Sequence, residues 1–335
     1  MSVERQVVMV TGPGRSGTST MAGALVELGL AVPGRALPGN ATNPRGFFEP
    51  AWAVPFHRRL LEDCGVGTLD PVPTARDRVA KRCGRPDVRE ELAQWLSRRL
   101  DEQPRVVVKD PRLIWFVPLW TEVARDLGVE PTHVVMLRHP AEVAGSRERY
   151  YRGPEASTDP AELRAHQIGY VAGWTNVLLQ TEAVTRGARR VFVRYPDLVA
   201  GWRTQLTRVD TSLGLGLRGA LAADPSPVDA LIDPALHRVR ADGWQGVDVP
   251  GWLQDLGERT WQTFGRLADD EQEDTVLDDV RALTAAYEGE VRDAVALTRN
   301  ARRRARLGGY RRGLREAAEH DRAGLVERVR RRLTR

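Results

Sequence analysis

The chain has 335 residues, of which 41% are hydrophobic, so it can form one large α/β domain with additions or two modest domains. It carries 50 basic and 45 acidic residues, a formal net charge of +5, and only two cysteines, Cys64 and Cys83. This composition excludes a disulfide framework and a cysteine-rich metal site, and no apolar run reaches the roughly 20 residues that span a membrane.

Strand residues begin within a few positions of Met1, which leaves no room for a signal peptide. Because two cysteines without a pairing pattern fit a reducing compartment, we expect a cytoplasmic protein. Lysine occurs only at positions 81 and 109, and the other 48 of the 50 basic residues are arginine. The single lysine at a strand end, Lys109, is therefore a more informative residue than an average lysine.

The first motif is a strand, a glycine-rich turn and a helix. Residues 7–10 form a short apolar strand, and residues 18–28 place apolar side chains on one helical face. Gly12, Gly14 and Gly17 let the backbone between them turn sharply and approach a ligand closely. Backbone N–H groups and the helix dipole favour an anion at such a turn.

The turn is close to the phosphate-binding consensus G-x-x-x-x-G-K-[ST]. Gly12 and Gly17 have the required spacing, and Ser19 stands at the last position. Thr18 replaces the lysine that reaches the β- and γ-phosphates of a nucleoside triphosphate, while Arg15 supplies a positive charge inside the loop. The sequence thus favours anion binding over hydrolysis of ATP or GTP.

Strands and helices alternate through the following residues up to about 213. We expect further strands at 105–109, 133–137 and 189–195, and helices at 51–64, 88–100, 114–127, 141–151, 162–185 and 197–213. Loops rich in turn residues occupy 32–50 and 154–160. This alternation predicts an α/β fold: a P-loop-like, three-layer arrangement with a central parallel sheet flanked by helices.

The last part of the chain has no strand pattern. From about residue 248 it is expected to be helical, and apolar residues between 276 and 294 recur at three- and four-residue steps. Arginine clusters at 302–304 and 330–332 make the end basic. We therefore expect an α/β domain over 1–247 and a basic, helical C-terminal extension over 248–335.

Polar segments follow three of the expected strands: residues 12–20, 109–112 and 138–146. In a parallel α/β sheet, ligands bind beyond the carboxyl ends of the strands. The three segments are therefore expected to meet in a single site.

These segments resemble the motifs of one enzyme family. Gly14-Arg15-Ser16-Gly17-Thr18-Ser19 resembles the 5′-phosphosulfate loop of sulfotransferases that use 3′-phosphoadenosine-5′-phosphosulfate (PAPS). Arg138-His139-Pro140, followed by Ser146, resembles their 3′-phosphate motif. Asn43-x-x-Gly46-x-x-Glu49 and Lys109-Asp110-Pro111-Arg112 are similar to segments of bacterial members, and the resemblance covers roughly residues 7–213.

The resemblance implies a PAPS-dependent sulfotransferase that needs no bound metal. It implies that the loop holds the 5′-phosphosulfate, that an arginine and a serine hold the 3′-phosphate, and that a tyrosine lies near the adenine. The donor-binding residues so implied are Gly14, Arg15, Ser16, Gly17, Thr18, Ser19, Arg138, Ser146 and Tyr195. An arginine suits a phosphate because its planar fork binds two oxygens. For Tyr195, a core position at a strand end is the alternative.

A base is required because the acceptor hydroxyl must lose a proton. Glu49 is the preferred residue: it follows Phe47 and Phe48, which could desolvate it and raise its pKa. The alternative for Glu49 is a structural role at a helix N-terminus. His57 and His139 are competing candidates for the base.

Two cations are assigned to the transfer itself. Arg15 would neutralise the leaving phosphate, and Lys109 could reach the oxygen that bridges sulfur and phosphorus. The alternative for Lys109 is an ion pair with Asp110.

Two other functions remain open. A strand that ends in Asp110 fits the magnesium-binding strand of a nucleoside or metabolite kinase, although Thr18 argues against it. A non-catalytic P-loop-like protein with a basic tail could contact a membrane surface peripherally. There is no recognition-helix motif, so we expect no nucleic-acid partner.

The sequence does not name the acceptor, and the oligomeric state is not indicated. A hydroxyl on a glycan or glycosylated metabolite, or another small molecule, is the favoured acceptor class. The pocket is expected from the loops at 32–50 and 154–160, with aromatic faces from Phe47, Phe48, Trp52 and Trp115.

Overall fold

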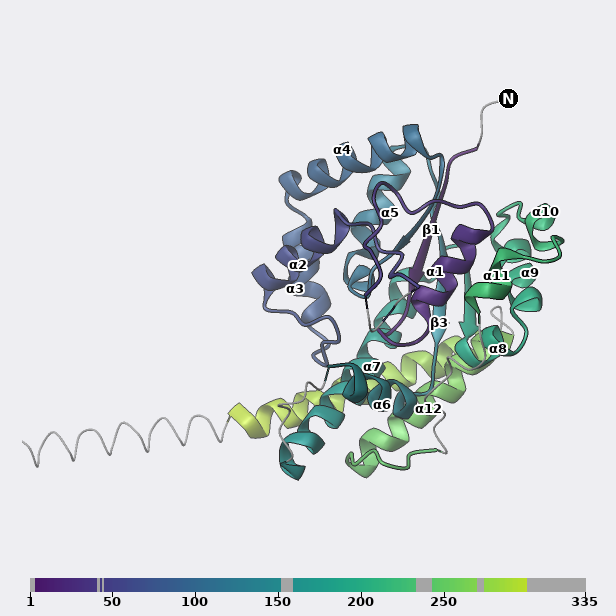
Figure 1. Ribbon diagram of the computed structural model, residues 1–335. Helices are drawn as coiled ribbons and strands as arrows, with labels where there is room; N and C mark the ends of the chain where they lie inside the picture. The colour runs from purple at the N-terminus through teal and green to yellow at the C-terminus, as the bar shows by residue number, and fades with distance from the viewer. Residues whose placement is uncertain are drawn as a thin grey trace, which may run out of the picture. The chain divides into compact units, whose positions relative to one another are not determined.

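The centre of the structure, a computed structural model, is a sheet of four parallel strands in the order β2-β1-β3-β4 (Figure 1). The structure describes residues 4–40, 43, 45–151, 159–232, 243–269 and 274–299. The strands are β1 (Gln6–Thr11), β2 (Arg105–Lys109), β3 (Thr132–Leu137) and β4 (Arg190–Arg194). All four expected strands are therefore confirmed, and no strand end differs from its expected position by more than one residue.

Helices fill most of the remaining described chain. They are α1 (Thr18–Glu27), α2 (Ala53–Cys64), α3 (Ala75–Cys83), α4 (Pro86–Glu102), η1 (Leu113–Phe116), α5 (Val117–Asp126), α6 (Pro140–Tyr151), α7 (Pro160–Thr185), α8 (Tyr195–Ala200), α9 (Trp202–Leu213), α10 (Arg218–Leu221), α11 (Pro227–Leu231) and α12 (Gly251–Asp269). A further helix covers 274–299. The arrangement is the α/β fold that the sequence predicts.

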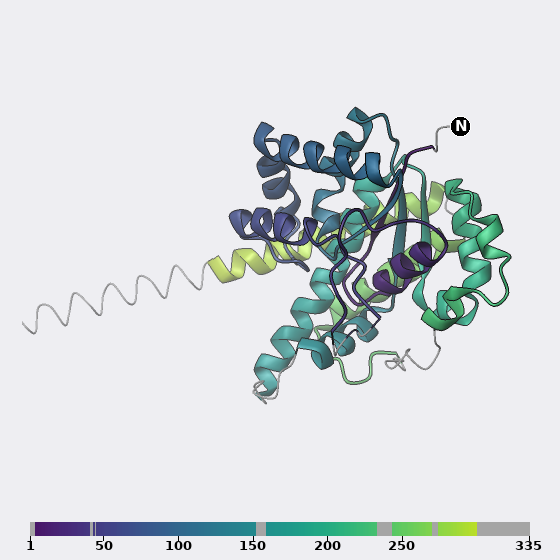
Figure 2. The ribbon, with the colours of Figure 1, turned by 45° about the horizontal axis from the view of Figure 1, so that its top comes forward.

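The side chains of β1 show how the sheet joins two cores. Val7 and Met9 belong to a cluster with α2, α3, α4 and α5, whereas Val8 and Val10 belong to a cluster with α1 and α9. Successive side chains of a strand point to opposite faces, so an all-apolar strand is buried on both. Figures 1 and 2 show α2 to α5 on one side of the sheet and α9 to α11 on the other.

The helix α12 packs beside β4. Phe192 and Phe264 lie 5.9 Å apart between ring centroids, and Arg194 forms an ion pair with Asp269 at 2.6 Å. This helix belongs to the first of two compact units of the chain, which spans Met1–Thr284. The remaining residues, from Ala285, form a second unit, and both arginine clusters of the tail lie outside the described residues.

Three local features differ from the expectation. Residues 114–127 form two helices, and Pro118 is tolerated because it lies in the first turn of α5, where no intrahelical N–H bond is lost. The helix expected at 197–213 is divided at Gly201, which ends α8 and precedes α9. Helix α3 was missed because only Ala75 and Val79 are buried, which gives too weak an apolar pattern.

Candidate active site

The glycine-rich turn adopts a conformation that depends on glycine. Gly12 and Gly17 have φ of 129° and 85°, and Gly17 is the N-cap of α1. A Cβ on Gly12 would lie 2.5 Å from the Met136 carbonyl oxygen of the neighbouring strand. The turn between β1 and α1 is thus fixed tightly against β3, with the N-terminus of α1 at its end.

Two buried hydroxyls belong to this turn. The Oγ of Ser16 and the Oγ1 of Thr11 are both buried and have no hydrogen-bond partner among the residues that the structure describes. Buried polar groups are nearly always hydrogen-bonded, so such hydroxyls suit a ligand with acceptor oxygens. The residues of the turn therefore fit a bound phosphate or sulfate, and Thr11 is a candidate that sequence reasoning missed.

Arg15 connects the turn to α6. Its Nε donates to the Ser146 Oγ at 3.1 Å, and its guanidinium lies 4.4 Å from the centroid of the Tyr150 ring. Arg15 has a φ of 79°, which is uncommon outside glycine. The structure therefore brings together Arg15 and Ser146, which the sequence assigned to different phosphates of one donor.

Arg138 is buried beside the same turn. Its Nη1 donates to the Arg15 carbonyl oxygen at 3.1 Å, and its Nε donates to the Glu142 Oε2 at 2.6 Å. The ring of Tyr195 lies 4.9 Å from the guanidinium. Arg138 thus holds the backbone of the turn, and Glu142, one helical turn along α6, is a counter-charge that the sequence analysis did not consider.

The Tyr195 ring packs on the turn at Gly17. A Cβ on Gly17 would lie 2.1 Å from the Tyr195 Cδ2, so the ring rests directly on the Gly17 backbone. Burial raises the pKa of Tyr195, against the lowering effects of Arg138 and of a hydrogen bond with Thr20. Thr18 and Ser19 follow Gly17 in the first turn of α1.

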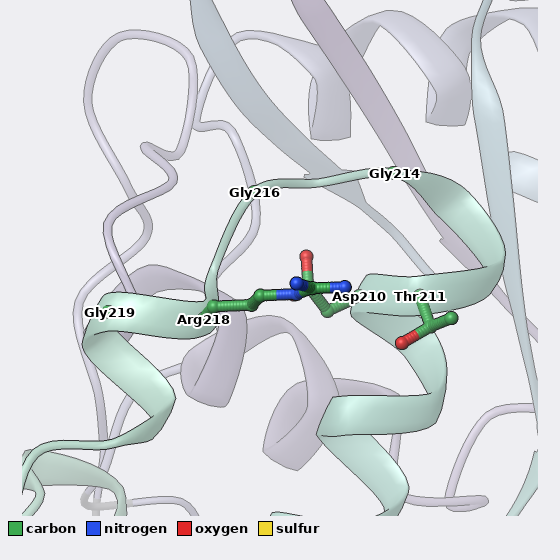
Figure 3. Close-up of a pocket in the computed structure, with 6 residues that line it drawn as sticks. All are labelled: Asp210, Thr211, Gly214, Gly216, Arg218 and Gly219. Atoms are coloured by element: carbon green, nitrogen blue, oxygen red, sulfur yellow. The ribbon is translucent and has the colours of Figure 1, made fainter.

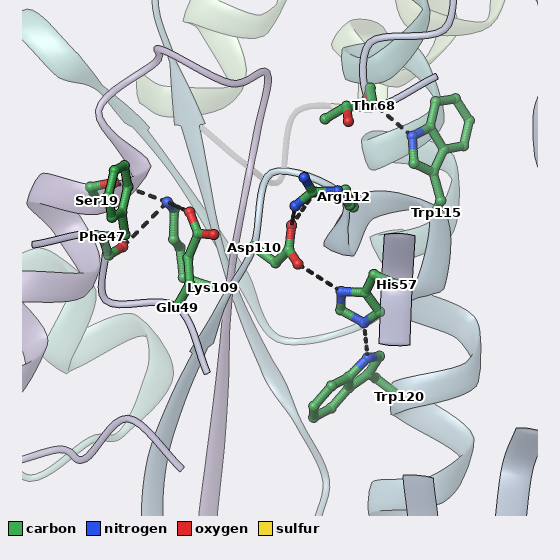
Figure 4. Close-up of polar contacts among 10 residues, drawn as sticks. All are labelled: Ser19, Phe47, Glu49, His57, Thr68, Lys109, Asp110, Arg112, Trp115 and Trp120. Atoms are coloured by element: carbon green, nitrogen blue, oxygen red, sulfur yellow. Dashed lines mark hydrogen bonds and ion pairs between the residues drawn. The ribbon is translucent and has the colours of Figure 1, made fainter. Parts of the chain in front are cut away.

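Lys109 and Glu49 form a buried ion pair at the start of α1 (Figure 4). The Lys109 Nζ donates to Glu49 Oε1 at 2.6 Å, to the Ser19 Oγ at 2.9 Å and to the Phe47 carbonyl oxygen at 3.3 Å. The alternative of a Lys109–Asp110 pair is therefore wrong. Adjacent side chains at the end of β2 point to opposite faces of the sheet, so Lys109 and Asp110 cannot meet.

Glu49 is held by an extended segment that doubles back. Its carbonyl oxygen accepts from the Leu37 N–H at 2.8 Å, and the preceding residue, Phe48, has a φ of 54°. The helix-terminal alternative for Glu49 is wrong, because α2 begins four residues later at Ala53. The Phe48 ring packs on Gly23 of α1, where a Cβ would lie 2.7 Å from it, and so anchors the segment.

The environment of Glu49 raises its pKa. Burial is the largest cause, and the charge of Asp110 adds to it, while Lys109 and Arg112 act in the opposite direction. An elevated pKa on a carboxylate is what a general base requires near neutral pH.

His57 is fully buried between Asp110 and Trp120. Its Nδ1 lies 3.0 Å from the Asp110 Oδ2, and the Trp120 Nε1 donates to its Nε2 at 2.9 Å. Because an indole N–H can only donate, Nε2 is the acceptor nitrogen and Nδ1 carries the proton. His57 has no nitrogen left for an acceptor proton, so it is not supported as the base.

His139 is also engaged elsewhere. Its Nε2 lies 3.1 Å from Glu258 Oε2 of α12, and its Nδ1 accepts from the Ala141 N–H at 3.3 Å. Its ring meets Trp244 and Trp261 edge to face. The residue fastens α12 to the end of β3, and the geometry does not support it as a base.

A further guanidinium, that of Arg147, lies over the turn, and the sequence analysis did not consider it. Arg147, next to Ser146 on α6, has its Nη1 3.5 Å from the position of a Cβ on Gly14. Its guanidinium lies 4.9 Å from the centroid of the Tyr170 ring. Its position next to Ser146 in the sequence was the available signal.

The aromatic residues expected at the acceptor pocket lie in different places. Trp115 is buried and donates its N–H to the Thr68 carbonyl oxygen at 3.1 Å. Trp52 stacks on Phe56 at 4.6 Å and on Trp95 at 4.5 Å. Trp115 is therefore a core residue and is not placed to stack on an acceptor, whereas Trp52 is half-buried against the same core. Residues 154–158 of the second expected pocket loop lie outside the described residues.

A cavity of about 380 Å³ lies away from this site (Figure 3). Its lining residues are Asp210, Thr211, Gly214, Gly216, Arg218 and Gly219. The loop that forms it accepts hydrogen bonds from Gln6 and Arg105, the first residues of β1 and β2. The cavity is thus at the amino ends of the strands, opposite the edge where the candidate residues meet.

In the described part of the chain, no group of three or more histidine, cysteine, aspartate or glutamate side chains is placed to hold a metal ion. Within the same residues, no helix has both the length and the apolar character needed to cross a membrane.

Neither the family models nor the curated proteins give a match to this chain. Solved structures do. The sulfotransferase domain of the olefin synthase of Synechococcus PCC 7002 is 18% identical, with 79% of this chain and 97% of that chain covered and a TM-score of 0.43. The sulfotransferase domain from the curacin biosynthetic pathway is 15% identical, with 79% and 99% covered and a TM-score of 0.42. Sulfotransferase STF1 from Mycobacterium tuberculosis is 17% identical, with 68% and 76% covered and a TM-score of 0.42.

Proposed function

We propose that this protein transfers a sulfuryl group from PAPS to a hydroxyl of an acceptor. In this reaction the acceptor oxygen forms a bond to sulfur while the bond from sulfur to the 5′-phosphate oxygen breaks. The bonding electrons leave with 3′-phosphoadenosine-5′-phosphate, and the proton of the acceptor hydroxyl goes to Glu49. Such a transfer depends mainly on positioning and on stabilising charge.

The residues around the glycine-rich turn support the donor-binding half of the proposal. The turn offers backbone N–H groups, the buried Ser16 hydroxyl and the first-turn hydroxyls of Thr18 and Ser19. The guanidinium of Arg138 donates to the backbone of the turn, and that of Arg15, itself in the turn, donates to Ser146 of α6. These groups would hold the two phosphate ends of the donor and neutralise the leaving phosphate.

The observation that carries the proposal is the buried chain Ser19–Lys109–Glu49. In it a cation and a carboxylate of raised pKa lie together at the N-terminus of α1, where the helix dipole would favour an anion. Lys109 would bind the developing negative charge of the leaving oxygen. Once Lys109 turns toward that oxygen, Glu49 would be free to take the acceptor proton.

The geometry gives less support to a kinase. Both carboxylate oxygens of Asp110 are engaged, one by His57 and the other by the N–H and Nη1 of Arg112. A magnesium-binding aspartate at a strand end needs an oxygen directed at the metal. Thr18 also stands where the kinase lysine would be, so sulfuryl transfer remains the preferred function.

For the acceptor we propose a hydroxyl on a glycan or glycosylated metabolite. The direct test is incubation of the full chain with radiolabelled PAPS and a panel of glycosides, with ATP in place of PAPS as the control. Formation of a labelled sulfate ester that depends on Glu49 supports the proposal. Transfer of phosphate from ATP, without sulfate transfer, would favour the kinase.

A further inference from the structure

The hydrogen bonds of the buried chain Trp120–His57–Asp110 have only one consistent direction. Trp120 donates to the His57 Nε2, so the His57 Nδ1–H donates to Asp110. The imidazole ring is stacked on Phe116 at 4.4 Å between centroids, with an interplanar angle of 7°. Both the protonated nitrogen and the orientation of His57 are therefore fixed by packing.

Asp110 is an ionised carboxylate whose oxygens are fully bonded. Its Oδ2 accepts from His57, and its Oδ1 accepts from the backbone N–H of Arg112 at 2.8 Å and from the Arg112 Nη1 at 2.9 Å. Burial acts to raise the pKa of Asp110, but these bonds and charges outweigh it and the pKa lies below its usual value. A buried negative charge is thereby kept at one position.

The charge of Asp110 lies next to the pair formed by Glu49 and Lys109. Lys109 precedes Asp110 in the chain, and Figure 4 shows the two carboxylates in adjacent positions on either side of the end of β2. The charged groups that act on Glu49 are Lys109 and Arg112, which favour its ionised form, and Asp110, which opposes it.

We propose that His57 is a positioning residue that holds Asp110 as a fixed negative charge beside Glu49, and so keeps Glu49 ready to accept a proton. His57 would act only through Asp110, since its own nitrogens are both occupied. The catalytic meaning of this arrangement rests on the role proposed for Glu49. The arrangement itself can be tested without any donor or acceptor.

The test is an NMR titration of the full chain labelled with ¹³C at glutamate side chains. The Glu49 signal is assigned by its loss in Glu49→Gln. In Asp110→Asn we expect the Glu49 midpoint to move to lower pH by about 1 pH unit, because the opposing charge is removed. In His57→Phe we expect a smaller shift in the same direction, because Asp110 loses a donor and holds its proton to higher pH.

The matched control is Trp115→Phe. Trp115 and Trp120 lie in the same apolar cluster, and each variant removes one indole N–H hydrogen bond. The bond of Trp115 goes to the Thr68 carbonyl oxygen, whereas that of Trp120 goes to His57. The Glu49 midpoint should stay at its wild-type value in Trp115→Phe. In Trp120→Phe, ¹⁵N spectra of labelled histidine should show a weakened preference for protonation at Nδ1.

The outcomes are separable. If Asp110→Asn leaves the Glu49 midpoint unchanged, or if wild-type His57 carries its proton on Nε2, the inference is overturned. If His57→Phe does not fold, the inference is still tested by the Glu49 midpoint in Asp110→Asn and by the protonated nitrogen of His57 in the wild type. If the midpoints move as expected but no sulfate transfer is found, the proposed function fails while the positioning chain stands.

Discussion

The Nζ of Lys109 lies 2.6 Å from the Oε1 of Glu49, and both side chains are more than nine-tenths buried. Neighbouring residues in the sequence do not suggest this contact, since 60 positions separate the two. Removing one partner of such a buried ion pair destabilises the folded protein, because the other charge is left buried and uncompensated. Changes at Glu49 should therefore affect both the folding stability of the protein and the proton transfer proposed for this residue.

Replacement of Glu49 by glutamine tests the base. If Glu49 accepts the proton in the transition state, turnover should fall by about 10²–10⁴-fold, while the apparent affinity for the acceptor changes little. Steady-state kinetics with labelled PAPS measure this. A variant with near-normal turnover would exclude Glu49 as the base and would leave the proton acceptor to be sought elsewhere.

The pH profile should show the raised pKa of Glu49. The base acts in its deprotonated form, so a raised pKa moves the loss of activity on acidification to higher pH than for an ordinary glutamate. Turnover measured across the acidic range should therefore decline at a higher pH than the usual glutamate pKa. The residual activity of Glu49→Gln should lack this decline, and its persistence there would assign it to another group.

The ion pair should also appear in a double-mutant cycle of stability. We compare Glu49→Gln, Lys109→Met and the double variant, and expect a coupling of about 1–3 kcal/mol between them. Glu49→Gln should by itself lower the stability, since Lys109 keeps its charge and loses its counter-ion. Denaturant unfolding measures the four stabilities, and strictly additive losses would refute the coupling.

Arg138→Ala should weaken binding of 3′-phosphoadenosine-5′-phosphate by about 1.5–3 kcal/mol, the scale of a charge-assisted hydrogen bond. The loss should be smaller for the nucleotide without the 3′-phosphate, and the wild type should prefer the 3′-phosphate form strongly over ATP. Calorimetry with 3′-phosphoadenosine-5′-phosphate, with the form that lacks the 3′-phosphate and with ATP measures these affinities.

Arg138 also pairs with Glu142, so Arg138→Ala alone leaves that carboxylate without its partner. The control is therefore Arg138→Ala/Glu142→Gln, which removes the carboxylate as well. Equal losses for all nucleotides would make Arg138 a purely structural residue.

Gly17→Ala should be more destabilising than Gly29→Ala. Both glycines have positive φ, at 85° and 106°, so both variants carry a backbone penalty of roughly 1–2 kcal/mol. Only at Gly17 would the new Cβ also meet the ring of Tyr195, since nothing lies within 4 Å at Gly29. Thermal unfolding compares the two, and equal losses would show that Tyr195 does not press on the turn.

Local sequence patterns predicted the sheet and the edge at which the site lies. The apolar runs of β1, β2, β3 and β4 have no polar face, and this alone requires a sheet covered on both sides. The turn at Gly12 and Gly17 is a property of backbone conformation within a few residues, so its geometry was also predictable. Helix α3 was missed because its local apolar pattern is weak.

The partners of the charged residues required the tertiary structure. Lys109 and Asp110 are adjacent in sequence, yet they face opposite sides of the sheet and pair with residues 60 and 53 positions away. His57 was a candidate base until its contacts with Trp120 and Asp110 fixed its protonated nitrogen. The face of the sheet to which a side chain points is set by its position in the strand. The side chain that it contacts there depends on how distant segments of the chain pack. The sequence by itself therefore determined the edge of the sheet at which the candidate residues gather and their types, and only the fold decided which of them contact one another.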